Sequence, residues 1–169
     1  ARLAGAAIEL VTVEAFPEAM EKFKAGECDL VTTDGSGLVG NRAKEGALND
    51  WAIFPASPIS KEPLGPVYRS NDSQWADIVN WTVYATFIAD EYGVGRANVD
   101  SFDYDANPEM GRLMGKNDGE LQTVMGLSAD AFYNVIKQVG NYDEIYSKNL
   151  NPVGLYREGS ANAPWTEGG

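Results

Sequence analysis

Thr32, Thr33 and Asp34 are the residues whose types and spacing are best suited to binding chemistry. They end an apolar run and are followed by Gly35, so hydroxyl groups and a carboxylate could face a cationic group with little steric obstruction. An ammonium on Asp34 would donate charge-assisted hydrogen bonds, which are about twice as strong as neutral ones. Residues 36–37 could start a helix whose amides bind an anionic group. The set suits a zwitterion, but Asp-Gly is also a common turn dipeptide, and Asp34 could serve as a helix cap alone.

Two other chemistries would also use an aspartate at this position. In a receiver-type signalling domain, an aspartate at a strand end accepts a phosphoryl group, and Lys61 could be the lysine that such a site needs. The acidic pair that would hold Mg²⁺ does not occur at an earlier strand end of this chain. A carboxylate hydrolase needs two acids at a set distance, and Glu62, Asp72 and Asp103 are available as partners. Their sequence context does not distinguish them from ordinary surface acids.

The composition excludes several classes of site and partner. The 169 residues contain no histidine, which excludes Ser-His-Asp and Cys-His catalysis and histidine metal sites. Cys28 is the single cysteine and cannot form a zinc site, so we expect no metal and no other cofactor. It is expected to be a buried free thiol, or to pair with a cysteine outside this chain. The formal net charge of −12 disfavours nucleic acid as a partner, because a polyanion would be repelled.

The apolar pattern predicts the elements that position Asp34. Residues 8–13 and 28–33 are rich in β-branched residues, which predicts two strands. Between them, Pro17 fits the start of a helix and Gly26 its end. A strand, a helix and a strand at this spacing predict a βαβ unit with parallel strands. Asp34 would then lie at the carboxyl end of a strand, which is the sheet edge where open α/β proteins bind ligands.

The rest of the chain is predicted to be an extended crossing followed by helices. Residues 51–54 predict another strand, the proline-rich segment 55–66 an extended crossing, and residues 67–69 the completion of a strand. Four helices should follow. The first is long, amphipathic and covers residues 73–92, and the others begin at Asn107, at Ser128 and at Asn141, where Glu144 predicts a capping box.

Segments along nearly the whole chain resemble a known family. They are GECDLVTTDGSGLVGNRAK, ISKEPLGPVYR, QWADIVNWTVYA, NPEMGRLMG, GLSADAF and VGNYDEIYSKNL. In order and spacing they resemble the C-terminal part of the general L-amino-acid-binding periplasmic component of polar amino-acid ABC importers, in solute-binding protein family 3.

The resemblance implies an α/β, two-lobed periplasmic-binding-protein-like fold that closes on one amino acid. Residues 1–54 would be the C-terminal half of the second lobe, residues 55–69 the return hinge, and residues 70–169 the helical C-terminal part of the first lobe. It implies a non-enzymatic periplasmic receptor that delivers L-amino acids to an ABC permease in the inner membrane. Asp34 would bind the ligand α-ammonium, with Thr33 as a further polar contact and Thr32 beside it.

The family has a long N-terminal part that is absent here. With it are absent the residues that contact the ligand α-carboxylate. Five arginines of this chain do not stand at the family's carboxylate-binding position: Arg42, Arg69, Arg96, Arg112 and Arg157. We therefore expect the missing N-terminal half, or a second copy, to complete the lobes. An amino-acid-sensing domain of a signalling receptor is the alternative function, which an adjoining transmembrane or kinase segment would favour.

Overall fold

The computed structural model describes residues 8–55, 59–60 and 63–169. The chain divides into two compact units, Ala1–Ser57 and Pro58–Gly169, and each is described by itself. Lys61 and Glu62, which the sequence offers for a phosphoryl site and a hydrolase site, lie outside the described residues.

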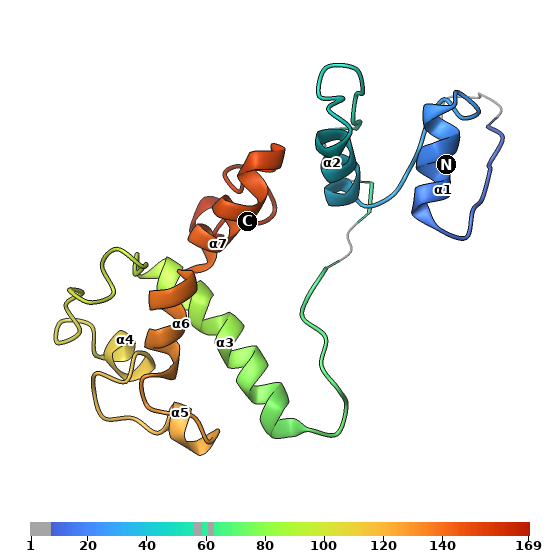
Figure 1. Cartoon of the computed structure of the whole chain (residues 1–169). Coiled ribbons are helices and arrows are strands. Elements are labelled where there is room, and N and C mark those ends of the chain that lie inside the picture. The colour runs from blue at the N-terminus through green and yellow to red at the C-terminus, as the bar shows by residue number, and fades with distance from the viewer. Residues whose placement is uncertain (1–7, 56–58, 61–62) are drawn as a thin grey trace. The chain divides into compact units, whose positions relative to one another are not determined.

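The described residues of the first unit form two helices, α1 (Phe16–Lys24) and α2 (Gly35–Lys44), coloured blue to teal in Figure 1. The predicted helix between residues 13 and 28 is confirmed: Pro17 lies in its first turn, and Gly26 follows its end with a φ of 74°. The buried apolar side chains of the first unit, among the described residues, are Met20, Val39 and Ala47. This small core leaves most apolar side chains of the unit in contact with solvent.

The strands predicted at residues 8–13, 28–33, 51–54 and 67–69 are wrong for the described chain, which contains helices and turns but no strand. A β-strand exists only where its backbone hydrogen-bonds to a neighbouring strand. Residues 8–13 and 28–33 form neither helix nor sheet, and their backbone groups make no hydrogen bond to another described backbone group. The α/β class is therefore not formed by this chain alone. Cys28 is a free thiol, half-buried instead of fully buried as predicted.

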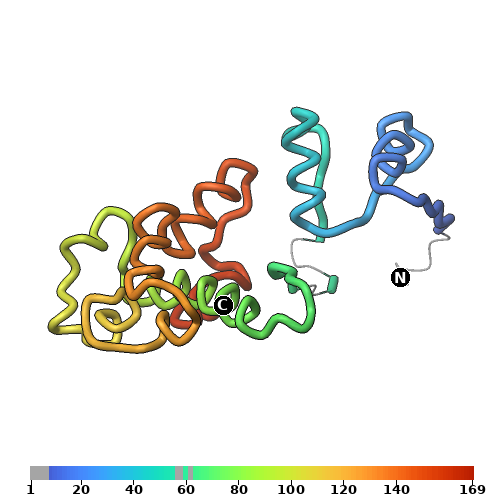
Figure 2. The backbone as a smooth tube through the Cα atoms, turned by 60° about the horizontal axis from the view of Figure 1, so that its bottom comes forward, coloured from blue at the N-terminus to red at the C-terminus, as the bar shows by residue number. Residues whose placement is uncertain are grey.

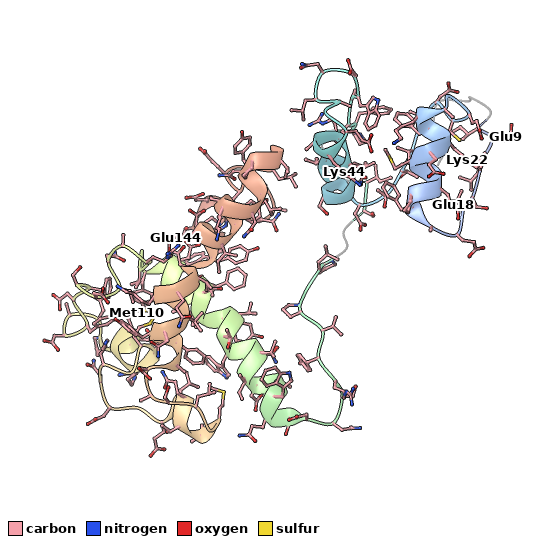
Figure 3. The ribbon with its side chains drawn as sticks, viewed as in Figure 1. Glu9, Glu18, Lys22, Lys44, Met110 and Glu144 are labelled. Atoms are coloured by element: carbon pink, nitrogen blue, oxygen red, sulfur yellow. The ribbon has the colours of Figure 1, made fainter. Side chains whose placement is uncertain are left out.

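The second unit is built on the long helix α3 (Ser73–Glu91), against which α6 (Ala131–Val139) and α7 (Tyr142–Leu150) pack. Figures 1 and 2 show α3 in green with the orange and red helices beside it. The shorter helices are α4 (Pro108–Leu113), α5 (Leu121–Val124) and the 3₁₀ turns η1 (Asn151–Val153) and η2 (Trp165–Glu167). The core of this unit consists of Ala85, Ala89, Val94, Val99, Met110, Leu113, Met114, Met125, Phe132 and Ile136. Met110, a fully buried residue of this core, is labelled in Figure 3.

Local capping chemistry explains why these helices were predictable. Asp72 accepts a hydrogen bond from the amide of Trp75 at 2.9 Å, which caps α3. Asn141 and Glu144 form the predicted capping box at the start of α7. Gly115 follows α4 with a φ of 66°, and an added Cβ there would lie 2.1 Å from the carbonyl oxygen of Ala129. A glycine is therefore required at that position.

Helix α5 was not predicted, because its four residues are too few to show a periodic pattern. A buried side chain holds it in place. Gln122 donates from Nε2 to the carbonyl oxygens of Arg112 and Leu113, at 3.1 and 2.5 Å. The position of α5 thus depends on a contact with α4.

A charged surface cluster joins the loop around residue 100 to α6. The Asp100 carboxylate accepts hydrogen bonds from Tyr133 Oη at 2.5 Å and from Lys137 Nζ. The hydrogen bonds from Lys137 and Tyr133 hold the pKa of Asp100 below its usual range. Lys116 Nζ lies 3.9 Å from the centre of the Tyr133 ring.

This cluster predicts a specific pH dependence of stability. Since the folded pKa of Asp100 lies below its unfolded value, the cluster stabilises the fold above the ordinary carboxyl pKa and loses this effect as the pH falls through the folded pKa. The Tm of the wild type should therefore be higher than that of Asp100→Asn at pH 7. This difference in Tm should shrink as the pH is lowered from about 4. Thermal unfolding followed by circular dichroism measures this, with Asp105→Asn as the control. A difference in Tm that does not change with pH would contradict the role of the Asp100 charge.

Candidate functional site

Asp34 lies at the junction between residues 28–33, which form no helix, and helix α2. Its backbone is extended, with φ −53° and ψ 139°, and its carbonyl oxygen accepts the first helical hydrogen bond, from the amide of Leu38 at 2.9 Å. Its side chain makes no capping hydrogen bond, although Asp34 occupies the cap position. The carboxylate is thus held at the start of a helix and is exposed, without a partner among the described residues.

Thr32 and Thr33 are exposed and directly precede Asp34, so the three candidate side chains are neighbours on one short stretch of backbone. Helix α2 begins at Gly35, one residue before the predicted start. The first turn packs close to Thr33, since a Cβ added at Gly37 would lie 3.4 Å from Thr33 Cγ2, in ordinary van der Waals contact. The first-turn amides of a helix have no intrahelical acceptor, so a polar ligand here could meet both amide donors and the Asp34 carboxylate.

Two of the acids proposed for a hydrolase have local structural partners. Asp72 caps α3, and the Asp103 carboxylate accepts a hydrogen bond from the amide of Ala106 at 3.0 Å. Each of these two bonds is of a kind that stabilises a turn or a helix start. Within the described ranges, His, Cys, Asp and Glu side chains form no group of three or more that could hold a metal ion.

The second unit contains a buried arginine that the sequence did not single out. The Arg157 side chain is 8% exposed, and its Nη1 lies 2.5 Å from Asp90 Oδ2 and 3.4 Å from Asp143 Oδ1. Its Nε donates to the carbonyl oxygen of Asn162 at 2.7 Å, and its guanidinium lies 4.9 Å from the centre of the Tyr142 ring. Burial alone would lower the pKa of Arg157, but the hydrogen bonds and charges of Asp90 and Asp143 raise it above its usual value.

A cavity of about 330 Å³ adjoins Arg157 in this unit. Aromatic side chains of Phe87, Tyr142 and Trp165 contribute to its wall. Because Arg157 is already paired with two carboxylates, it does not offer an unneutralised positive charge to a ligand carboxylate. The arrangement instead fastens the segment after α7 to α3.

The sequence of this chain is similar to known proteins over nearly all of its length. It is 43% identical over 163 residues to the general L-amino acid-binding periplasmic protein AapJ of Rhizobium johnstonii, a match that covers 94% of this chain and 47% of that protein. It is also 43% identical over 156 residues to the glutamate/glutamine/aspartate/asparagine-binding protein BztA of Rhodobacter capsulatus, covering 90% of this chain and 45% of that protein. The chain is homologous to the general L-amino-acid-binding periplasmic proteins. The predicted resemblance is thereby confirmed.

A solved structure shows the same relationship in three dimensions. The ABC transporter/periplasmic binding protein from Brucella ovis with glutathione bound matches at a TM-score of 0.83 and 40% identity, over 94% of this chain and 50% of that chain. This chain therefore matches part of a periplasmic-binding-protein fold. It spans about half the length of the curated relatives it matches. No family model matches the sequence. No helix in the described part of the chain is both long and apolar enough to cross a membrane.

Proposed function

We propose that this chain supplies the ammonium-binding side of an L-amino-acid site in a periplasmic solute-binding protein. The protein would deliver its ligand unchanged to an ABC permease in the inner membrane. The observation that carries this proposal is the carboxylate of Asp34 at the start of α2, which is exposed and has no partner among the described residues, in a chain homologous to amino-acid-binding proteins. Thr33 and Thr32 would add hydroxyl contacts to the same ligand group.

The proposed architecture has two lobes, of which this chain forms a part of each. Residues 1–54 are the C-terminal half of the second lobe, residues 55–69 the return hinge, and residues 70–169 the helical C-terminal part of the first lobe. Arg157 is buried and paired, which supports a site whose α-carboxylate contacts come from outside this chain. The N-terminal half or a second copy would supply them, and closure of the lobes would enclose the ligand.

The relatives suggest which part of the ligand Asp34 recognises. Glutamate, glutamine, aspartate and asparagine differ in their side chains but share an α-ammonium and an α-carboxylate. Glutathione, which is bound in the Brucella ovis protein, carries the same two free groups on its γ-glutamyl residue. We therefore infer that the ligand of this chain is defined by a free L-α-amino-acid head group, and that the side chain is read elsewhere.

A chimera tests this function. It joins the 169-residue chain to the part of the Brucella ovis protein that the structural match leaves out. Calorimetry should show one-to-one binding of L-glutamate, L-leucine and glutathione. N-acetyl-L-glutamate, which differs from L-glutamate by a blocked ammonium, should not bind, because it cannot form the ion pair with Asp34. Equal affinity for the acetylated ligand would reject the role of Asp34, and a correctly folded chimera that binds none of the ligands would reject the function.

A further inference from the structure

The cavity of the second unit lies where the end of α3, the start of α7 and the C-terminal segment meet. Its volume of about 330 Å³ is at the lower end of the range that small-molecule sites occupy, about 300–1,000 Å³. Phe87, Tyr142 and Trp165 line it, together with the acidic residues Asp90 and Glu91. The lining therefore combines aromatic rings with carboxylates.

The aromatic lining of this cavity already holds one cation. The Arg157 guanidinium lies 4.9 Å from the centre of the Tyr142 ring, which also packs against Phe87 with ring centres 4.1 Å apart. Trp165 is different, because it is 73% exposed and contacts neither an aromatic ring nor a cation in this way among the described residues. Tryptophan forms the strongest cation–π interactions of the aromatic side chains. Its indole ring is therefore available to a cationic ligand.

The charges around the cavity also favour a cation. Asp90 and Glu91 contribute two carboxylates and Arg157 one guanidinium, so the lining carries one negative charge in excess. Arg157 and Asp90 neutralise each other, since their closest atoms are 2.5 Å apart. Glu91 forms no ion pair with another described residue, and its charge attracts cations to the cavity.

The lining selects one class of cation. Within the described ranges, no group of three acidic, histidine or cysteine side chains could hold a metal ion. A primary ammonium is strongly hydrated and needs several acceptors in place of its water. A quaternary ammonium has no N–H group to satisfy, and aromatic rings bind it well.

We propose that this cavity binds a small, free quaternary ammonium compound, with Trp165 and Glu91 as its main contacts. Trp165 would supply the aromatic face, and Glu91 the opposite charge. The proposal goes beyond the amino-acid-binding function and does not depend on it, because the residues that line the cavity do not include Asp34.

Titration with choline tests this site. Saturation-transfer NMR, which observes the methyl protons of the ligand, should show binding to the 169-residue chain at constant ionic strength. The uncharged analogue, in which a tert-butyl group replaces trimethylammonium, should bind at least about fivefold more weakly, because the ring and the carboxylate attract only the cation. Equal affinity for the two compounds, or no choline binding, would overturn the proposal. Sedimentation of the chain with phosphatidylcholine vesicles would also overturn it, because the ligand would then be a lipid head group.

Three variants locate the contacts. Trp165→Ala should weaken choline binding by about fivefold or more. Trp75→Ala is the matched control, because Trp75 is 51% exposed on α3 but does not line the cavity, and it should bind choline as wild type does. Glu91→Gln should weaken the binding of choline by about twofold or more and leave that of the uncharged analogue unchanged. Wild-type affinity in Trp165→Ala, or equal losses in both tryptophan variants, would show that choline does not bind at this cavity.

Discussion

Replacing Asp34 by Asn in the chimera is expected to weaken L-glutamate binding by about 2 kcal/mol or more, which is about 30-fold in Kd. The substitution keeps the shape of the side chain and removes its negative charge. A closed binding site excludes water, so the ligand ammonium would lose its charged partner and stay buried. The side chain makes no capping bond that the substitution could break, and the fold should therefore be unaffected.

Calorimetry on two matched variants separates this effect from a general change of charge. Asp29→Asn makes the same substitution at an exposed aspartate five residues earlier, where we propose no ligand contact. It should leave the Kd for L-glutamate unchanged. Circular dichroism would detect any effect of this substitution on folding. Asp34→Asn with wild-type affinity, or equal losses in both variants, would show that Asp34 does not bind the ammonium.

Replacing Arg157 by Met should destabilise the second unit by about 3–5 kcal/mol. Arg157 and Asp90 are 8% and 14% exposed, and their closest atoms are 2.5 Å apart. Removal of the guanidinium leaves the Asp90 charge buried without its partner. It also removes the hydrogen bond from Arg157 Nε to the carbonyl oxygen of Asn162. The segment after α7 should then exchange its amides faster, because Arg157 fastens it to α3.

Thermal unfolding of three variants checks the cause. Lys137→Met breaks the ion pair with Asp100, where both side chains are about half exposed, and it should lower the Tm much less than Arg157→Met does. Arg157→Met combined with Asp90→Leu should recover much of the lost stability, because no buried unpaired charge remains; Asp143, the second carboxylate beside Arg157, is half exposed to solvent. If the double variant is no more stable than Arg157→Met, the loss comes from packing and not from an uncompensated charge.

The helices were predictable because their signals are local. Asp72 caps α3 through an amide three residues away, and Asn141 and Glu144 close a capping box over the same separation. Such contacts form whatever the rest of the chain does, so residue types at fixed spacing predict them. The homology was likewise predictable, since the order and spacing of motifs can be compared between sequences without any knowledge of the fold. The predicted location of Asp34 on a sheet edge is wrong for the described chain, because residues 28–33 form no strand and Asp34 instead lies at the start of α2.

The sequence by itself determined most of the helices and the caps at Asp72 and Asn141, which carboxylate stands beside two hydroxyls, and which protein family the chain resembles. The tertiary structure decided what depends on distant partners. Residues 8–13 and 28–33 carry strand-forming side chains, but a strand also needs a neighbour, and none is present among the described residues. Arg157 became a buried anchor through Asp90, 67 residues away, and no local pattern encodes that pairing. Local spacing specifies a helix because its hydrogen bonds close within one turn, whereas a sheet or a buried ion pair exists only after the chain has folded.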